Sequence, residues 1–315
     1  MASQTGLGNH DVDKEPRKGN IPFILDSGRT FLLNVPDAYD PGQPHPLVLS
    51  FHGGDGTSER QQRITQLSSP TLRIADKPFL TAYGQALVNQ ELGGRTAWQG
   101  APYDNKNVDD IQYVRDILTA VWQRGAYHID TSRVYACGKS NGGGLVVLLA
   151  CHPDAPTDTF AALAVVSPAL YDGTWAVHGD LRQRPPVPML HVHGTKDTVT
   201  PFRGQPTGQG WGPLPDVRAW RRLWAERNGA GGGYPGALVQ PDRVEEVHPG
   251  VWEEVWNCGP EGGSGAEVRA LSVEGLGHSW PTTEGLDYSG RPDYKAGFNF
   301  TEEHLVQFFS RHSLV

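Results

Sequence analysis

Apolar and polar residues alternate along the chain in short blocks. Short apolar runs bounded by turn-forming residues predict buried strands. These runs lie at residues 21–25, 30–35, 47–51, 79–83, 134–137, 161–167, 188–192, 244–256 and 268–273. Apolar residues at helical spacing predict helices at 107–124 and 217–228, and the apolar run after Gly144 predicts a buried helix. Thr301 is the expected N-cap of a closing helix. Strands that alternate with helices indicate an α/β fold with a mostly parallel central sheet flanked by helices.

The same pattern indicates one folded domain. The chain has 315 residues, and we find neither an internal repeat nor a linker long enough to require a second domain. Residues 1–20 are polar and predict a flexible lead-in, which leaves residues 21–315 as a single domain. The lead-in lacks the charged-then-apolar pattern of a secretory signal. Two locations therefore stay open: the cytoplasm, or the outside of the cell after removal of a signal.

Composition argues against several classes of partner. The formal net charge is −8 and the pI is near 5.8, which disfavours a nucleic acid or an anionic membrane surface. No apolar stretch approaches the length of a membrane span. Three cysteines are too few for a disulfide framework. Cys137 is expected to be a buried thiol, and one bridge between Cys151 and Cys258 stays open as an alternative to free thiols.

A candidate nucleophile lies at Ser140. The local sequence is Gly138-Lys139-Ser140-Asn141-Gly142, which follows a β-prone run and precedes the apolar helix. A strand-to-helix turn of this kind holds the serine in a strained conformation, and glycines two residues away on either side prevent collisions. The helix N-terminus stabilises the negative charge that develops when an ester is attacked. The pattern therefore predicts a nucleophilic serine on a tight turn.

A nucleophilic serine requires a base, and the base requires an acid that orients it. In open α/β sheets such groups follow the carboxyl ends of strands. The strand at 188–192 leads to Asp197, and the strand at 268–273 leads to His278. The order Ser140, Asp197, His278 is the order of α/β-hydrolases and differs from the chymotrypsin and subtilisin orders. We therefore predict these three residues as the catalytic set.

Other polar residues compete for these roles. His191 and His193 alternate on one strand and could face one side as metal ligands, but no nearby Cys or Glu cluster completes a site. We expect structural imidazoles there, with His193 bonded to the turn that carries Asp197. Asp172 and Asp180 follow an earlier strand and are weaker alternatives to Asp197 as the orienting acid.

The oxyanion hole is expected to use backbone N–H groups. One is that of Asn141, directly after the nucleophile, and a second comes from Gly53 or Gly54 in the loop after the strand at 47–51. Glycine in this loop lets the backbone approach a substrate closely. His52 begins the loop, and we expect it to brace the loop.

Two tryptophans are the best placed to line a pocket. Trp98 lies in an irregular segment, 84–106, and Trp280 follows the predicted base by two residues. An aromatic wall suits a planar phenolic acyl group through stacking. Packing in the core is the alternative for Trp280, whereas the helical spacing of Trp220 and Trp224 indicates a helix face.

Several segments carry a family resemblance. They are His52-Gly53-Gly54, Trp98, Asn107-Val108-Asp109-Asp110, the run 133–143 with Ser140-Asn141-Gly142-Gly143, His193-Gly194-Thr195-Lys196-Asp197 and Gly277-His278-Ser279-Trp280-Pro281. Together they resemble the feruloyl esterase, acetylxylan esterase and polyhydroxybutyrate depolymerase group of α/β-hydrolases. The likeness covers roughly residues 25 to 310.

The resemblance implies a secreted carboxylic-ester hydrolase that uses Ser140, Asp197 and His278 and needs no metal or other cofactor. Hydroxycinnamate esters such as feruloyl esters become the leading substrates, either as small molecules or linked to a polysaccharide. Acetylated xylan and hydroxyalkanoate polyesters are the alternatives. The chain departs from many relatives after His52, where it carries two glycines instead of cysteine or a bulkier residue, and this leaves the second oxyanion donor open.

The sequence disfavours two further classes of protein. A catalytically silent α/β-hydrolase fold used for binding is disfavoured because all three catalytic positions are filled. A serine peptidase of similar fold is disfavoured because the chain has no room for an added propeller or a large cap. For the esterase, the rate is expected to rise with pH through about 6 to 7 as His278 loses its proton. The sequence does not indicate whether the protein is a monomer or an oligomer.

Overall fold

The computed structural model describes residues 16–122, 127–230, 239–258, 266–287 and 291–314. Its strands, in chain order, are β1 (Gly19–Ile24), β2 (Thr30–Val35), β3 (His45–Phe51), β4 (Leu80–Gly84), β5 (Val88–Asn89), β6 (Arg95–Thr96), β7 (Ile129–Lys139), β8 (Ala162–Val166), β9 (Met189–Gly194), β10 (Arg243–His248), β11 (Val251–Trp256) and β12 (Val268–Val273). The helices are α1 (Ser58–Thr65), α2 (Asp110–Trp122), α3 (Asn141–Cys151), α4 (Asp172–Trp175), α5 (Val217–Arg227) and α6 (Val306–Arg311). Short helical turns are η1 (Gln90–Leu92), η2 (Thr157–Thr159), η3 (Leu181–Gln183), η5 (Pro292–Tyr294) and η6 (Thr301–Leu305).

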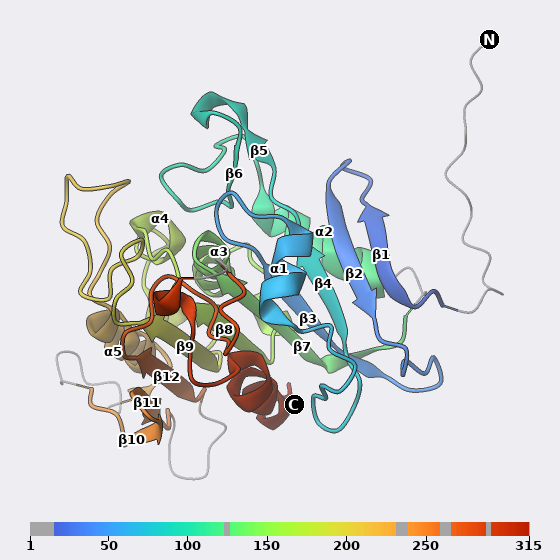
Figure 1. Ribbon diagram of the computed structural model, residues 1–315. Helices are drawn as coiled ribbons and strands as arrows, with labels where there is room; N and C mark the ends of the chain where they lie inside the picture. Colours follow the sequence, from blue (N-terminus) through green and yellow to red (C-terminus); the bar gives the residue numbers. More distant parts are fainter. Residues whose placement is uncertain (1–15, 123–126, 231–238, 259–265, 288–290, 315) are drawn as a thin grey trace.

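Ten of the described strands form one large sheet, and β5 and β6 pair separately with each other (Figure 1). Its ten strands follow the order β1-β2-β4-β3-β7-β8-β9-β12-β11-β10. The six strands from β4 to β12 in this order pair in parallel, and antiparallel hairpins add β1 and β2 at one edge and β10 and β11 at the other. The predicted α/β fold with a mostly parallel sheet is confirmed.

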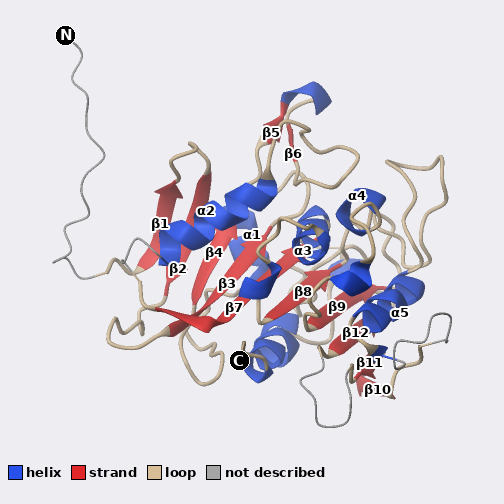
Figure 2. Cartoon of the chain, turned by 180° about the vertical axis from the view of Figure 1, so that it is seen from behind, coloured by secondary structure: helices blue, strands red, loops and turns tan. Residues whose placement is uncertain are grey.

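The longer helices cover both faces of this sheet (Figure 2). Apolar side chains of α2, α3 and α5 pack with one face, and those of α1 and α6 pack with the other. Alternate residues of β3 divide accordingly: Leu47 and Leu49 belong to the first core and Val48 to the second. The central strands are therefore buried on both faces. A functional site is expected beyond the carboxyl ends of these strands, in the loops that follow them.

Helix α1 was not predicted from the sequence. Its eight residues, SERQQRIT, are mostly polar and show no apolar repeat, although Ile64 is buried. The local signal is the cap, since the Thr57 side chain accepts a hydrogen bond from the N–H of Arg60 at 3.2 Å. This polar helix matters for the site, because Arg60 and Gln61 face the cavity described below.

Two predicted boundaries are wrong. The single strand predicted at 244–256 is a hairpin of β10 and β11, because Pro249 and Gly250 turn the chain and Gly250 adopts φ +72°. Thr301 does not cap the closing helix. Its hydroxyl donates to the carbonyl of Thr65 and accepts from the indole of Trp280, and the chain passes through the π-helical turn η6 into α6.

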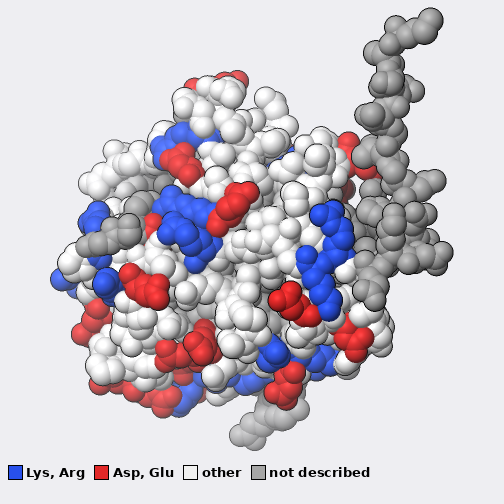
Figure 3. Space-filling view, turned by 45° about the vertical axis from the view of Figure 1, so that its right-hand side comes forward, with Lys and Arg blue, Asp and Glu red and all other residues white. Residues whose placement is uncertain are grey.

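The three cysteines are free, buried thiols, and the bridge considered between Cys151 and Cys258 is absent. Burial raises the pKa of Cys137, Cys151 and Cys258 to about 12 each. None of the described helices is long and apolar enough to cross a bilayer. On the face seen in Figure 3, basic and acidic side chains are interspersed. Of the predicted lead-in, residues 1–15 lie outside the described part, and β1 already begins at Gly19.

Candidate active site

The turn between β7 and α3 holds Ser140 in a strained conformation. Its φ and ψ are 54° and −120°, a region that costs a non-glycine residue about 1–3 kcal/mol. A Cβ on Gly138 would lie 2.3 Å from the carbonyl oxygen of Gly142, and a Cβ on Gly142 would lie 2.2 Å from that of Phe51. Both glycines are therefore required by close backbone packing, as the pattern predicted.

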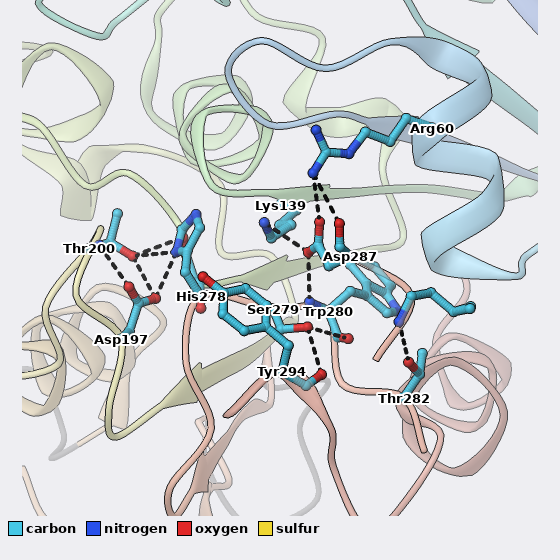
Figure 4. Close-up of polar contacts among 12 residues, drawn as sticks. Arg60, Lys139, Asp197, Thr200, His278, Ser279, Trp280, Thr282, Asp287 and Tyr294 are labelled. Atoms are coloured by element: carbon cyan, nitrogen blue, oxygen red, sulfur yellow. Dashed lines mark hydrogen bonds and ion pairs between the residues drawn. The ribbon is translucent and has the colours of Figure 1, made fainter. Parts of the chain in front are cut away.

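The loops after β9 and β12 bring an acid and a base together. The two strands are parallel neighbours, so the loops that follow their carboxyl ends lie side by side at the same end of the strands. There the Nδ1–H of His278 donates to Oδ2 of Asp197 at 2.8 Å (Figure 4). Both side chains are buried. The structure thus pairs the predicted base with the predicted acid, in preference to Asp172 or Asp180.

Asp197 is surrounded by donors. Its Oδ1 accepts the N–H groups of Val199 and Thr200 at 2.8 and 2.9 Å, and its Oδ2 accepts the Thr200 hydroxyl at 3.0 Å. Burial alone would raise its pKa, but the interaction with His278 and hydrogen bonds from His193 and His278 hold the pKa far below its ordinary value. Asp197 is therefore an anion, which fixes the imidazole tautomer with the proton on Nδ1.

The surroundings of His278 keep it neutral. Burial lowers its pKa below the ordinary value of 6.5, and the positive charge of Lys139 lowers it further, which together outweigh the opposite effect of Asp197. A neutral imidazole whose Nδ1 is engaged leaves Nε2 as the proton acceptor. That is the state required of a general base at neutral pH.

Ser140 and His278 line the same cavity, which has a volume of about 320 Å³. Within the described residues, the side-chain hydrogen bonds of His278 run to Asp197 and Thr200 and not to Ser140. Bonds between nucleophile and base are often long before substrate binds. The Ser140 hydroxyl and the His278 imidazole therefore face one cavity, in which a substrate could contact both.

The loop after β3 approaches the nucleophile closely. A Cβ on Gly53 would lie 3.2 Å from the Cβ of Ser140 and 3.7 Å from its Oγ, whereas one on Gly54 would meet only the carbonyl of Thr96, at 4.0 Å. The backbone of Gly53 therefore approaches the nucleophile more closely than that of Gly54. The N–H of Asn141 lies in the first turn of α3, where amides have no partner within the helix.

His52 braces this loop, as predicted. Its ring nitrogens contact the carbonyl of Gly53 at 2.7 Å and the N–H of Ala86 at 3.1 Å. Burial lowers its pKa to about 4, so the ring is neutral. Because the Ala86 N–H must donate to Nε2, the proton lies on Nδ1 and is donated to Gly53.

Trp98 and Trp280 do not line the cavity, and the predicted aromatic wall is wrong in these two residues. Both are fully buried. The indole of Trp98 donates to the carbonyl of His52 at 2.7 Å, and that of Trp280 donates to the Thr301 hydroxyl at 3.0 Å. Each indole N–H is hydrogen-bonded within the core, so these tryptophans pack beneath the loops of the site and do not contact a ligand.

A different aromatic group faces the cavity, and sequence analysis missed it. Tyr103, Tyr171 and Trp211 line it, with the ring of Tyr103 centred 5.8 Å from that of Tyr171 and 5.3 Å from that of Trp211. Trp211 is 48% exposed, which is unusual for a tryptophan. All three come from irregular segments, where no periodicity marks a buried or a facing side.

Charged residues also line the cavity. Lys139 and Arg60 both pair with Asp287, with nitrogen-to-oxygen distances of 2.8 and 3.3 Å. Arg95 pairs with Asp55 at 2.5 Å. Lys139 was visible in the nucleophile pattern, but nothing in the sequence linked it to Asp287, which lies 148 positions later (287 − 139).

His191 and His193 form part of a hydrogen-bonded chain rather than a metal site. Arg221 Nε donates to His191 at 3.2 Å, the two imidazoles are 3.3 Å apart, and His193 Nε2 lies 2.7 Å from the Thr200 carbonyl. Because a guanidinium only donates, it fixes both tautomers, and His193 donates to the turn of Asp197 as predicted. Among the described residues, no group of three or more His, Cys, Asp or Glu side chains is placed to hold a metal ion.

Comparisons with known proteins point to esterases. No protein-family model matches the chain. It is 29% identical over 267 residues to NocK of Nocardia uniformis subsp. tsuyamanensis, a protein assigned as an esterase, with 76% of this chain and 68% of NocK aligned. It is 28% identical over 178 residues to feruloyl esterase C of Emericella nidulans, with 56% of this chain and 58% of that protein aligned.

Solved structures decide the fold. Acetyl xylan esterase from Aspergillus awamori superposes with a TM-score of 0.55 at 15% identity, over 82% of this chain and 94% of that one. A thermostable esterase superposes with a TM-score of 0.54 at 16% identity, over 94% of this chain and 63% of that one. The chain has the α/β-hydrolase fold. The resemblance to feruloyl and acetylxylan esterases predicted from the sequence is confirmed.

Proposed function

We propose that this α/β-hydrolase is a serine carboxylic-ester hydrolase that acts through Ser140, His278 and Asp197. The observation that carries the proposal is an imidazole, bonded to a buried carboxylate, that shares a cavity with a serine on a strained turn. The names of the related proteins support the same class of enzyme.

The proposed reaction proceeds through an acyl-enzyme. Ser140 Oγ attacks the ester carbonyl while Nε2 of His278 accepts its proton. The N–H groups of Asn141 and Gly53 stabilise the oxyanion, and one such donor contributes about 3 kcal/mol in related chemistry. The imidazolium then protonates the departing alcohol. Water, deprotonated by His278, releases the acid from Ser140 by the same steps.

We infer that hydroxycinnamoyl esters such as feruloyl esters are the preferred substrates. The aromatic side of the cavity, formed by Tyr103, Tyr171 and Trp211, supports a planar phenolic acyl group through stacking. The volume of about 320 Å³ suits one small ligand. Similarity to feruloyl esterase C supports the same class. An acetyl group alone would leave the aromatic side without a partner.

A panel of three esters tests the proposal. We expect kcat/KM to be highest for methyl ferulate, lower for a naphthyl acetate and lowest for a hydroxybutyrate oligomer. Ser140→Ala should lower hydrolysis by a factor on the order of 10⁴ or more, whereas Ser132→Ala, outside the cavity, should not. Binding of methyl ferulate without hydrolysis by the unaltered protein would indicate a binding module. Preference for the acetate would indicate an acetyl esterase.

A further inference from the structure

Three charged side chains meet beside the proposed nucleophile and base (Figure 4). Nζ of Lys139 lies 2.8 Å from Oδ2 of Asp287, and the two side chains are only 5% and 1% exposed. The guanidinium of Arg60 lies 3.3 Å from Oδ1 of Asp287 and 3.1 Å from its carbonyl oxygen. A carboxylate and an ammonium group have thus been taken out of water next to the reacting groups.

Asp287 also holds the chain that carries the base. Its Oδ2 accepts the N–H of Trp280 at 3.1 Å, and Trp280 follows His278 by two residues. Lys139 is the last residue of β7 and directly precedes Ser140. One carboxylate therefore joins the segment with the nucleophile to the segment with the base.

A buried ion pair is poor evidence for stability, because the cost of desolvating two charges can exceed their attraction. The position of this pair between the two reacting segments indicates a role in catalysis. Resting on the proposed function, we propose that Asp287 and Lys139 are positioning residues for the base. Their ion pair sets the location of the His278 imidazole relative to the Ser140 hydroxyl and balances the charge around that imidazole.

Charged and polar groups face His278 from several elements. Asp197 and Thr200 contact it from the loop after β9, and His193 reaches the same carboxylate. Lys139 at the end of β7 lowers the pKa of His278, while Asp197 and Asp287 raise it. Arg60 of α1 forms an ion pair with Asp287. The two members of the ion pair therefore act on the base in opposite directions.

Opposite charge effects give the pair a distinctive signature. In Lys139→Met the loss of the cation should move the acid limb of the kcat/KM profile to higher pH. In Asp287→Asn the loss of the anion should move it to lower pH, each by on the order of half a pH unit. Both variants should also lower kcat about 10-fold or more, because the imidazole is displaced. Lys139→Arg keeps the charge and should keep the acid limb in place.

The matched controls come from a second buried ion pair. Arg29 and Asp110 lie 2.7 Å apart with side chains 8% and 1% exposed, and neither lines the cavity. Arg29→Met and Asp110→Asn should lower the melting temperature without moving the acid limb. If the Lys139 and Asp287 variants leave the acid limb unchanged, or move it in the same direction, the proposal is overturned.

A second readout separates this proposal from the proposed function. NMR titration of the His278 imidazole reports the same opposite shifts without any turnover. If the unaltered protein hydrolyses no ester, the proposed function fails, and the titration still tests the effect of the ion pair. Lys139→Gln replaces Lys139→Met in both measurements if the latter does not fold.

Discussion

At the scale of single residues, the chemistry depends on ionisation states that the surroundings impose. Asp197 stays charged in a buried position because four donors surround its two oxygens. His278 stays neutral because it is buried and lies near the charge of Lys139. Ser140 projects from a backbone conformation that only the small neighbours at 138 and 142 permit. None of these states can be assigned from residue type alone.

The pH dependence of hydrolysis follows from the state of His278. A base with a lowered pKa keeps its neutral form to lower pH, so kcat/KM should rise with a midpoint below the ordinary imidazole value of 6.5 and be level near pH 7 to 8. The ordinary value alone predicts this rise at about pH 6 to 7. Initial rates with methyl ferulate between pH 4 and 9 measure it. A midpoint above 6.5 would contradict the environment described for His278.

At the scale of elements, the catalytic set could be predicted because it depends on strand order. Parallel strands place the loops with Asp197 and His278 at one edge of the sheet, and short apolar runs are enough to find such strands. Helix α1 could not be found this way, because it is polar and Ile64 is its only buried apolar residue. Its Arg60 was missed with it.

The aromatic residues illustrate a second limit of the sequence. Trp98 lies in an irregular segment and Trp280 follows the predicted base, yet both are buried, and a carbonyl or a hydroxyl accepts each indole N–H. Trp211 faces the cavity from a loop with no periodic pattern. Which side of an irregular segment faces a ligand depends on contacts with residues far away in the sequence. The spacing of apolar residues within the segment does not predict those contacts.

The aromatic side of the cavity should control acyl specificity. Trp211→Ala is expected to raise KM for methyl ferulate about 2- to 10-fold, because an aromatic contact contributes roughly 0.5–1.5 kcal/mol beyond buried area. Hydrolysis of p-nitrophenyl acetate should change little, because an acetyl group makes no such contact. Trp252→Ala is the matched control, since Trp252 is 41% exposed and does not line the cavity. Equal losses for both esters would argue against stacking of the acyl group.

At the scale of the whole molecule, the site rests on a sheet buried on both faces. The nucleophile follows β7 in the middle of the sheet, and the acid and the base follow β9 and β12 on one side of it. The alternation of short strands with helices along the chain was sufficient to predict this architecture. The division of residues 244–256 into a hairpin depended on two residues, Pro249 and Gly250.

The free cysteines offer a test of this packing. Because burial raises the pKa of Cys137, Cys151 and Cys258 to about 12, we expect none to react with a thiol reagent at pH 8 in the folded protein. All three should react after denaturation without a reductant. Absorbance after addition of Ellman's reagent counts them. One reactive thiol after denaturation, instead of three, would reveal a disulfide that the structure does not contain.

The most direct test of the central claim is to locate a covalent adduct. A phosphonate ester that mimics the tetrahedral intermediate should react with one serine per chain, and peptide mass spectrometry identifies that serine. We predict a single adduct on Ser140, loss of esterase activity in proportion to its occupancy, and no adduct in Ser140→Ala. An adduct on another residue, or full activity with Ser140 fully modified, would contradict the assignment of Ser140 as the nucleophile.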